Sequence, residues 1–125
     1  MKLVQMFLKS TSLALTVMFL MADATAQGSF FRAIDDLPLM EGLNEAEDGT
    51  MVFDSSSGRI VEALSEGMVT RQRVIQFYSE TLPQLGWLEI SPGQFVREHE
   101  TLKIEFPTSS LGKALSVLFM LSPTQ

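Results

Sequence analysis

The sequence predicts an α+β domain in which one helix packs on a face of an antiparallel sheet of about five to six strands. Residues 71–85 carry apolar side chains at the i, i+3, i+4 spacing of an amphipathic helix. Several short segments are rich in β-branched and aromatic residues, and residues 101–106 alternate apolar with polar side chains. The connections between these segments are short, which favours antiparallel neighbours. The expected chain order is β-β-α-β-β-β-β.

The first two strands are expected at residues 50–54 (TMVFD) and 59–66 (RIVEALSE). The sequence Ser-Ser-Ser-Gly lies between them and consists of turn-forming residues. A short loop that contains glycine is typical of a β-hairpin, so we expect these two strands to pair.

The helix expected over residues 71–85 has clear signals at both ends. Thr70 is a suitable N-cap, and Gly86 suits the left-handed position that follows a helix. Pro83 removes a backbone hydrogen bond, so we expect a kink or a tightened last turn. The apolar stripe of this helix comprises Val74, Phe77, Tyr78, Thr81, Leu82 and Leu85.

Four more strands are expected after the helix, at residues 87–90, 94–98, 101–106 and 114–121. The last of them is apolar on both faces, since Leu118 and Met120 alternate with Val117 and Phe119. The core is predicted between the helical residues Val74, Phe77, Tyr78, Leu82 and Leu85 and the strand residues Trp87, Phe95, Leu102, Ile104, Val117 and Phe119.

The chain divides into a signal peptide (residues 1–26), an irregular acidic and apolar arm (27–49) and the α+β domain (50–125). In the arm, acidic residues are interleaved with large apolar ones, and their spacing follows neither the helical nor the strand period. Pro38 prevents a helix from running through the arm. We expect the arm to pack partly on the domain.

The first 26 residues follow the order of a secretory signal. Lys2 and Lys9 make a positive start, and residues 13–22 form an apolar run. This run is shorter than the roughly 20 residues of a membrane span. Small residues follow, so cleavage is expected after Ala26, or alternatively after Ala24. The protein is therefore expected to be periplasmic or secreted; an uncleaved N-terminal anchor is the alternative.

Residues 77–87 (FYSETLPQLGW) contain an aromatic pair, a Leu-Pro and a final Leu-Gly-Trp. This segment resembles a pattern in small secreted proteobacterial proteins, where it closes a helix and starts a strand. Residues 95–97 (FVR) and 102–104 (LKI) look like the same group, and residues 36–43 (DLPLMEGL) extend the match upstream. The resemblance covers most of residues 36–106. It implies a fold unit and carries no activity, cofactor or catalytic residue.

Composition excludes several classes of function. The chain has no cysteine, so it has no disulfide framework, no thiol nucleophile and no lipid anchor on a cysteine. Its net charge is −6, and it becomes −7 when Lys2, Lys9 and Asp23 leave with the signal peptide. An acidic chain without a basic stripe argues against nucleic acid and against an anionic membrane surface. We expect no stable membrane insertion after cleavage.

No catalytic constellation is visible in the sequence. His99 is the only histidine, and its neighbours Glu98 and Glu100 point away from it, so a solvated turn residue is expected. The serines at residues 55–57 have no assigned base. The acids at residues 35–48 match no calcium loop and are expected to be solvated. We expect no metal, no cofactor and no enzymatic activity.

Two places could take part in an interaction. Arg71 and Arg73 occupy the first helical turn, where they could hold an anion or an acidic segment; the favoured expectation is that both are exposed and pair with Glu66 or the acidic arm. Leu118 and Met120 form an apolar strand face that marks an interface unless the arm covers it. Coverage by the arm, through residues 30–43, is the favoured expectation.

These observations predict an exported, non-catalytic binding or adaptor domain of the cell envelope, with a protein partner or with self-association. One alternative is a small-ligand carrier that uses a groove between helix and sheet. A further alternative is a hydrolase built on the acidic and Ser/Thr residues.

Overall fold

The computed structural model describes residues 29–107 and 113–124 and shows an α+β domain with one six-stranded antiparallel sheet. The expected signal peptide lies outside the described residues. In chain order the elements are β1 (Leu43–Ser55), β2 (Gly58–Gly67), α1 (Arg71–Thr81), the 3₁₀-helix η2 (Leu82–Leu85), β3 (Leu88–Ser91), β4 (Gln94–Arg97), β5 (Glu100–Glu105) and β6 (Leu115–Pro123). The predicted α+β class is confirmed.

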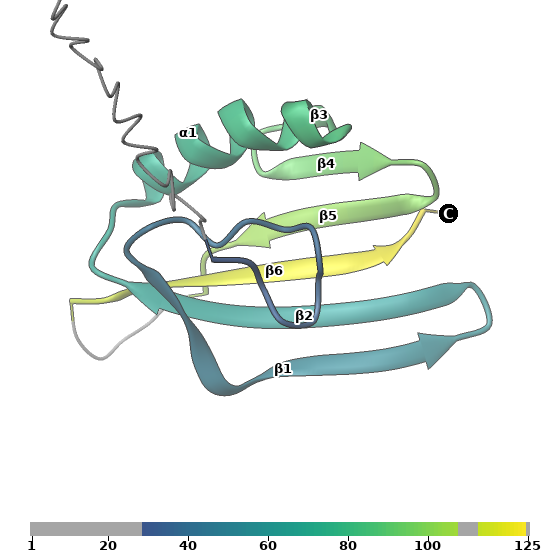
Figure 1. Cartoon of the computed structure of the whole chain (residues 1–125), viewed down its shortest axis with the longest axis horizontal. Helices are drawn as coiled ribbons and strands as arrows, with labels where there is room; N and C mark the ends of the chain where they lie inside the picture. Colours follow the sequence, from purple (N-terminus) through teal and green to yellow (C-terminus); the bar gives the residue numbers. More distant parts are fainter. Residues whose placement is uncertain (1–28, 108–112, 125) are drawn as a thin grey trace, which may run out of the picture.

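The spatial order of the strands is β1-β2-β6-β5-β4-β3, which differs from their order along the chain (Figure 1). The last strand returns to lie between β2 and β5, so β6 is central and joins two hairpin-connected halves. The backbone of β6 is therefore paired along both edges.

One face of the sheet carries the core, and two separate elements cover it. Residues 29–42, called the covering segment below, cross in front of β6 and β2, while α1 lies towards β4 (Figure 1). The Phe31 ring packs at 4.6 Å from the Phe119 ring of β6, and the Tyr78 ring of α1 packs at 5.0 Å from the same ring. Helix and segment therefore meet over the centre of the sheet.

Simple dimensions explain why a second cover is needed. A helix is about 10 Å across with its side chains. Six strands spaced about 4.8 Å apart make a sheet roughly 24 Å wide. The helix leaves the β1–β2–β6 side uncovered, and the covering segment fills this space with four side chains that are at most 4% exposed: Phe31, Ile34, Leu37 and Met40.

This arrangement corrects two expectations about the arm. The arm was expected to cover Leu118 and Met120, but its apolar residues lie on the opposite face, against Phe119. It was also expected to be irregular as far as residue 49, whereas β1 begins at Leu43. A register shift between Glu45 and Thr50 interrupts the alternation in this part of β1, which hides the strand from sequence patterning.

The ends of the helix agree with their sequence signals. The Thr70 hydroxyl accepts a 3.2 Å hydrogen bond from the Arg73 N–H. The last turn tightens into η2 at Pro83, and Gly86 adopts a left-handed conformation with φ 89°. The expected core is buried with two exceptions: Phe77 is half-buried and Leu85 is 38% exposed. A 3₁₀ turn has three residues instead of 3.6, which moves Leu85 off the helical stripe.

Candidate functional site

The sheet face opposite α1 is the most distinctive surface of the described chain. Cross-strand pairs place Leu64 beside Leu118, and Glu62 beside Met120. On the other side of β6, Lys103 lies beside Met120 and Glu105 beside Leu118. We call this surface the open face; its apolar residues are Met51, Phe53, Ile60, Leu64, Leu88, Val96, Leu118 and Met120.

Leu118 and Met120 therefore lie at the centre of the open face, as members of the central strand. Both side chains are half-buried, by their neighbours on the same face. No described element packs over them, because α1 and the covering segment both lie on the other side of the sheet. An apolar centre with acidic and basic neighbours resembles the anatomy of a protein interface, in which a polar rim surrounds an apolar middle.

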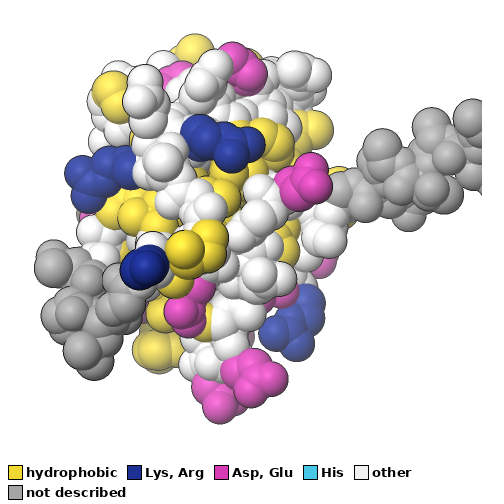
Figure 2. All heavy atoms as spheres, turned by 90° about the vertical axis from the view of Figure 1, so that its left-hand side faces the viewer, with side chains coloured by type: hydrophobic (Ala, Val, Ile, Leu, Met, Phe, Trp, Pro, Cys, Tyr) yellow, Lys and Arg dark blue, Asp and Glu magenta, His cyan; other side chains and the backbone are white. Residues whose placement is uncertain are grey.

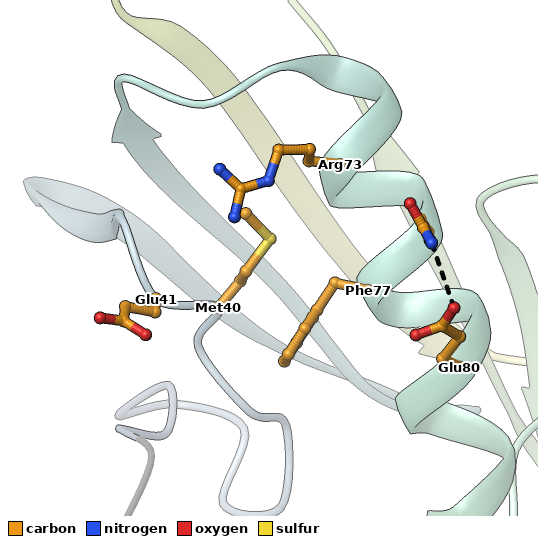
Figure 3. A pocket seen from close by; sticks show the side chains of 6 residues that line it. Met40, Glu41, Arg73, Phe77 and Glu80 are labelled. Atoms are coloured by element: carbon orange, nitrogen blue, oxygen red, sulfur yellow. Dashed lines mark hydrogen bonds between the residues drawn. The ribbon is translucent and has the colours of Figure 1, made fainter.

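Arg71 and Arg73 are not brought together. The Arg71 guanidinium lies over the Phe106 ring, 4.6 Å from its centre. Arg73 instead points towards the covering segment (Figure 3). Neither arginine belongs to an ion pair between described residues. The expected pairing with Glu66 or the acidic arm is not found within residues 29–107 and 113–124.

Arg73 lines a cavity of about 320 Å³ between α1 and the covering segment. Figure 3 shows its side chain next to Met40, with the Phe77 ring below and the Glu41 carboxylate to one side. Gln76 and Glu80 complete the lining, and the Gln76 amide donates a 3.3 Å hydrogen bond to the Glu80 carboxylate. The cavity offers one cation, two carboxylates and an aromatic ring to a small molecule.

Figure 2 looks at the side of the molecule where α1 begins. Hydrophobic side chains gather in the middle of this view, with basic and acidic side chains interspersed around them. The apolar residues near this end include the exposed Met68 and the half-buried Phe106. The charges are mixed in sign, so this end offers no uniform field to an anion or a cation.

The candidate catalytic residues have structural roles or are isolated. The Ser55 hydroxyl donates a 2.6 Å hydrogen bond to the Gly58 carbonyl oxygen and accepts one from the Ser57 N–H, which closes the β1–β2 turn. His99 is exposed in the turn between β4 and β5. Residues 29–107 and 113–124 contain no group of three His, Asp or Glu side chains that could hold a metal. Within the same residues no helix has the length and apolar character to cross a membrane.

Two features of the covered face were not anticipated. The Tyr78 hydroxyl joins α1 to the covering segment, where it donates a 2.7 Å hydrogen bond to the Pro38 carbonyl oxygen. The Arg97 guanidinium stacks 4.3 Å from the Trp87 ring and pairs with Asp36 at 2.5 Å. The hydrogen bond of Tyr78 had a signal in the sequence. A tyrosine on an apolar helical stripe is expected to be buried, and a buried hydroxyl needs a hydrogen-bond partner.

Comparisons of the chain with protein-family models, with curated proteins and with solved structures gave no match. The function is therefore argued from the two surfaces described above.

Proposed function

We propose that this protein is an exported, non-catalytic binding or adaptor domain of the cell envelope that recognises a protein partner through the open face. The main observation in support of this proposal is the position of Leu118 and Met120. Both lie on the central strand, on the side of the sheet that α1 and the covering segment do not cover. Export is inferred from the signal-like residues 1–26, and it places the partner in the periplasm or outside the cell.

The composition of the open face supports this proposal. A solvated sheet face in a soluble protein normally alternates polar side chains with the buried ones of the other face. Here Leu64, Leu118 and Met120 form a continuous apolar centre across two neighbouring strands. On the covered face, α1 and the covering segment bury the apolar side chains. Within the described residues no element buries the apolar centre of the open face.

Charge on the open face favours a protein over a lipid surface or a nucleic acid. Glu62 and Glu105 flank the apolar centre, and Lys103 lies across Met120 from Glu62. An acidic rim repels phosphate groups, whereas a protein partner can meet each charge with its opposite. A partner with basic side chains around an apolar contact fits this rim.

Co-purification from the producing cells tests the proposal. In the variant Leu118→Lys the new ammonium group lies beside Glu105, so the folded state keeps a partner for the charge. The bound partner should be lost from this variant and retained by Gln72→Lys, an exposed change on α1. Equal recovery of the same partner by both variants, with unchanged thermal unfolding, would place the binding site elsewhere.

The cavity between α1 and the covering segment favours a second function, a small-ligand carrier. The cavity lies between helix and covering segment, whereas the groove anticipated from sequence lay between helix and sheet. Native mass spectrometry of protein purified from its producing cells would detect a retained ligand. A ligand held here should dissociate from Arg73→Ala and remain on Arg71→Ala, because only Arg73 lines the cavity.

A further inference from the structure

The sheet has two edges, and they differ in how well they are protected against pairing with another chain. The β3 edge is four residues long and contains a register shift between Glu89 and Ser91. Short length and local irregularity are common means of preventing edge-to-edge association. The β1 edge is thirteen residues long. Of the two edges, β1 is therefore the one available to another strand.

The features that hinder pairing with another strand occur only in the first half of β1. The first half carries the register shift that ends at Thr50, the positive φ of Asp48 (56°), and an ion pair between Glu45 and Arg32. The second half has none of these features. At its centre are three large apolar side chains that alternate between the two faces: Met51, Val52 and Phe53 are 49%, 51% and 49% exposed. An edge segment of this kind is a template for a further strand.

The turn geometry shows which backbone groups are free. The Ser55–Gly58 pair closes the β1–β2 hairpin, so in an antiparallel ladder Phe53 and Met51 also direct their backbone groups towards β2. Thr50, Val52 and Asp54 then direct both their N–H and their C=O groups outwards. These three residues form a short row of backbone donors and acceptors that no described strand pairs.

We propose that this edge pairs with the same edge of a second copy of the chain, antiparallel and centred on Val52. The segment is self-complementary about that residue. Val52 faces its own copy, and Thr50 faces Asp54, so each outward donor meets an acceptor and no carboxylate faces another carboxylate. The intervening pairs place Met51 opposite Phe53 of the second copy, a contact between a thioether and an aromatic ring.

The pairing is closed and has a consequence for the open face. A two-fold contact uses the β1 edge of both copies, and the remaining β3 edges are the protected ones, so the assembly stops at two chains. Because Met51 and Phe53 belong to the open face, the open faces of the two copies lie on the same side of one continuous sheet. The proposal concerns an edge, so it can fail while the proposed function of the open face stands.

Cysteine pairs test the register directly, since the natural chain has no cysteine. Met51→Cys and Phe53→Cys face each other across the proposed two-fold axis, in a non-hydrogen-bonded pair whose Cα atoms are about 4.5 Å apart. A mixture of the two variants should form a disulfide-linked dimer much faster than either variant alone. In each variant alone the two sulfurs are offset by two residues along the strand. Equal rates in the mixture and in the separate variants would overturn the proposal.

Amide hydrogen exchange of the unmodified protein gives a second test that needs no variant to fold. The Val52 amide should become protected as protein concentration rises, while the Met51 and Phe53 amides are protected at every concentration by β2. Rapid exchange of Val52 at all concentrations would overturn the proposal. Protection of Val52 only after another envelope protein is added would also overturn it, and would assign the edge to a strand from that protein.

Discussion

The Tyr78 hydroxyl donates a 2.7 Å hydrogen bond to the Pro38 carbonyl oxygen and accepts a 3.2 Å hydrogen bond from the Met40 N–H. This side chain therefore connects α1 to the covering segment, while its ring contacts Phe119 of the sheet. Burial raises the pKa of Tyr78 well above its ordinary value, so the hydroxyl stays protonated and can donate. One residue links the three layers that make up the covered side.

Tyr78→Phe should lower the free energy of unfolding by about 1–3 kcal/mol, because it removes both hydrogen bonds and leaves a buried Met40 N–H without a partner. Chemical denaturation measures the loss, and hydrogen exchange at Met40 should quicken with it. Gln72→Ala, an exposed helical change, is the control and should be nearly neutral. If the two variants were equally stable, Tyr78 would not hold the segment.

Neighbouring phenylalanines test whether the covering segment belongs to the core. Phe31 is 2% exposed and packs on Phe119, whereas Phe30 is 53% exposed. Phe31→Ala should destabilise the protein by about 3–5 kcal/mol, as for other buried aromatic side chains. Phe30→Ala should change stability by much less. Similar small losses in thermal unfolding would show that the segment is a dispensable tail.

Acid should loosen the contact between Asp36 and Arg97. The hydrogen bond from the Arg97 guanidinium lowers the pKa of Asp36 below its ordinary value of 3.8. The ion pair therefore contributes stability above the unfolded-state pKa, and this contribution is lost as pH falls through the folded-state pKa. Asp36 is half exposed, so the contribution is at most about 1 kcal/mol.

Asp36→Asn isolates this effect. The variant should be slightly less stable than the natural protein near neutral pH, and the two should converge in the acid range when urea unfolding is followed against pH. A stability difference that stays constant as Asp36 protonates would mean that the ion pair is not its source.

Gly86→Ala should destabilise the protein by about 1–2 kcal/mol, because φ is 89° and a side chain with a Cβ is strained there. The new Cβ would meet only the Arg97 side chain, at 3.5 Å, so backbone strain and not a clash is the cause. Gly67→Ala, at an ordinary φ, would press its Cβ into the Gly42 carbonyl group and should be worse. Calorimetry of both variants checks this order.

The sequence predicted the helix and its ends well because these depend on local residues: Thr70 as the cap, Pro83 in the tightened turn and Gly86 after it. The central position of β6 depends on long-range pairing with β2 and β5, which has no local signal. The place of the covering segment also depends on distant parts of the chain. Its apolar residues predicted that it packs on the domain, but the face that it covers depends on how much of the sheet one helix leaves uncovered.

The candidate site was predictable in part for the same reason. Leu118 and Met120 stood out from the two-sided apolar pattern of the last strand, and the structure places both on the open face. Residues i and i+2 of a helix point to different faces, so the separation of Arg71 from Arg73 follows from the predicted helix. The neighbours they meet were not predictable: Phe106, just after β5, for Arg71, and Met40 of the covering segment for Arg73. Both of these neighbours are distant in the chain.

Site-specific photo-crosslinking in the producing cells tests the central claim, that the open face binds a protein, most directly. A photoreactive residue is placed at Met120 in one variant and at Gln72, on the solvent side of α1, in the other. We predict that Met120 captures one defined partner and that Gln72 does not. Capture of that partner from Gln72 and not from Met120 would contradict the assignment of the open face as the binding surface.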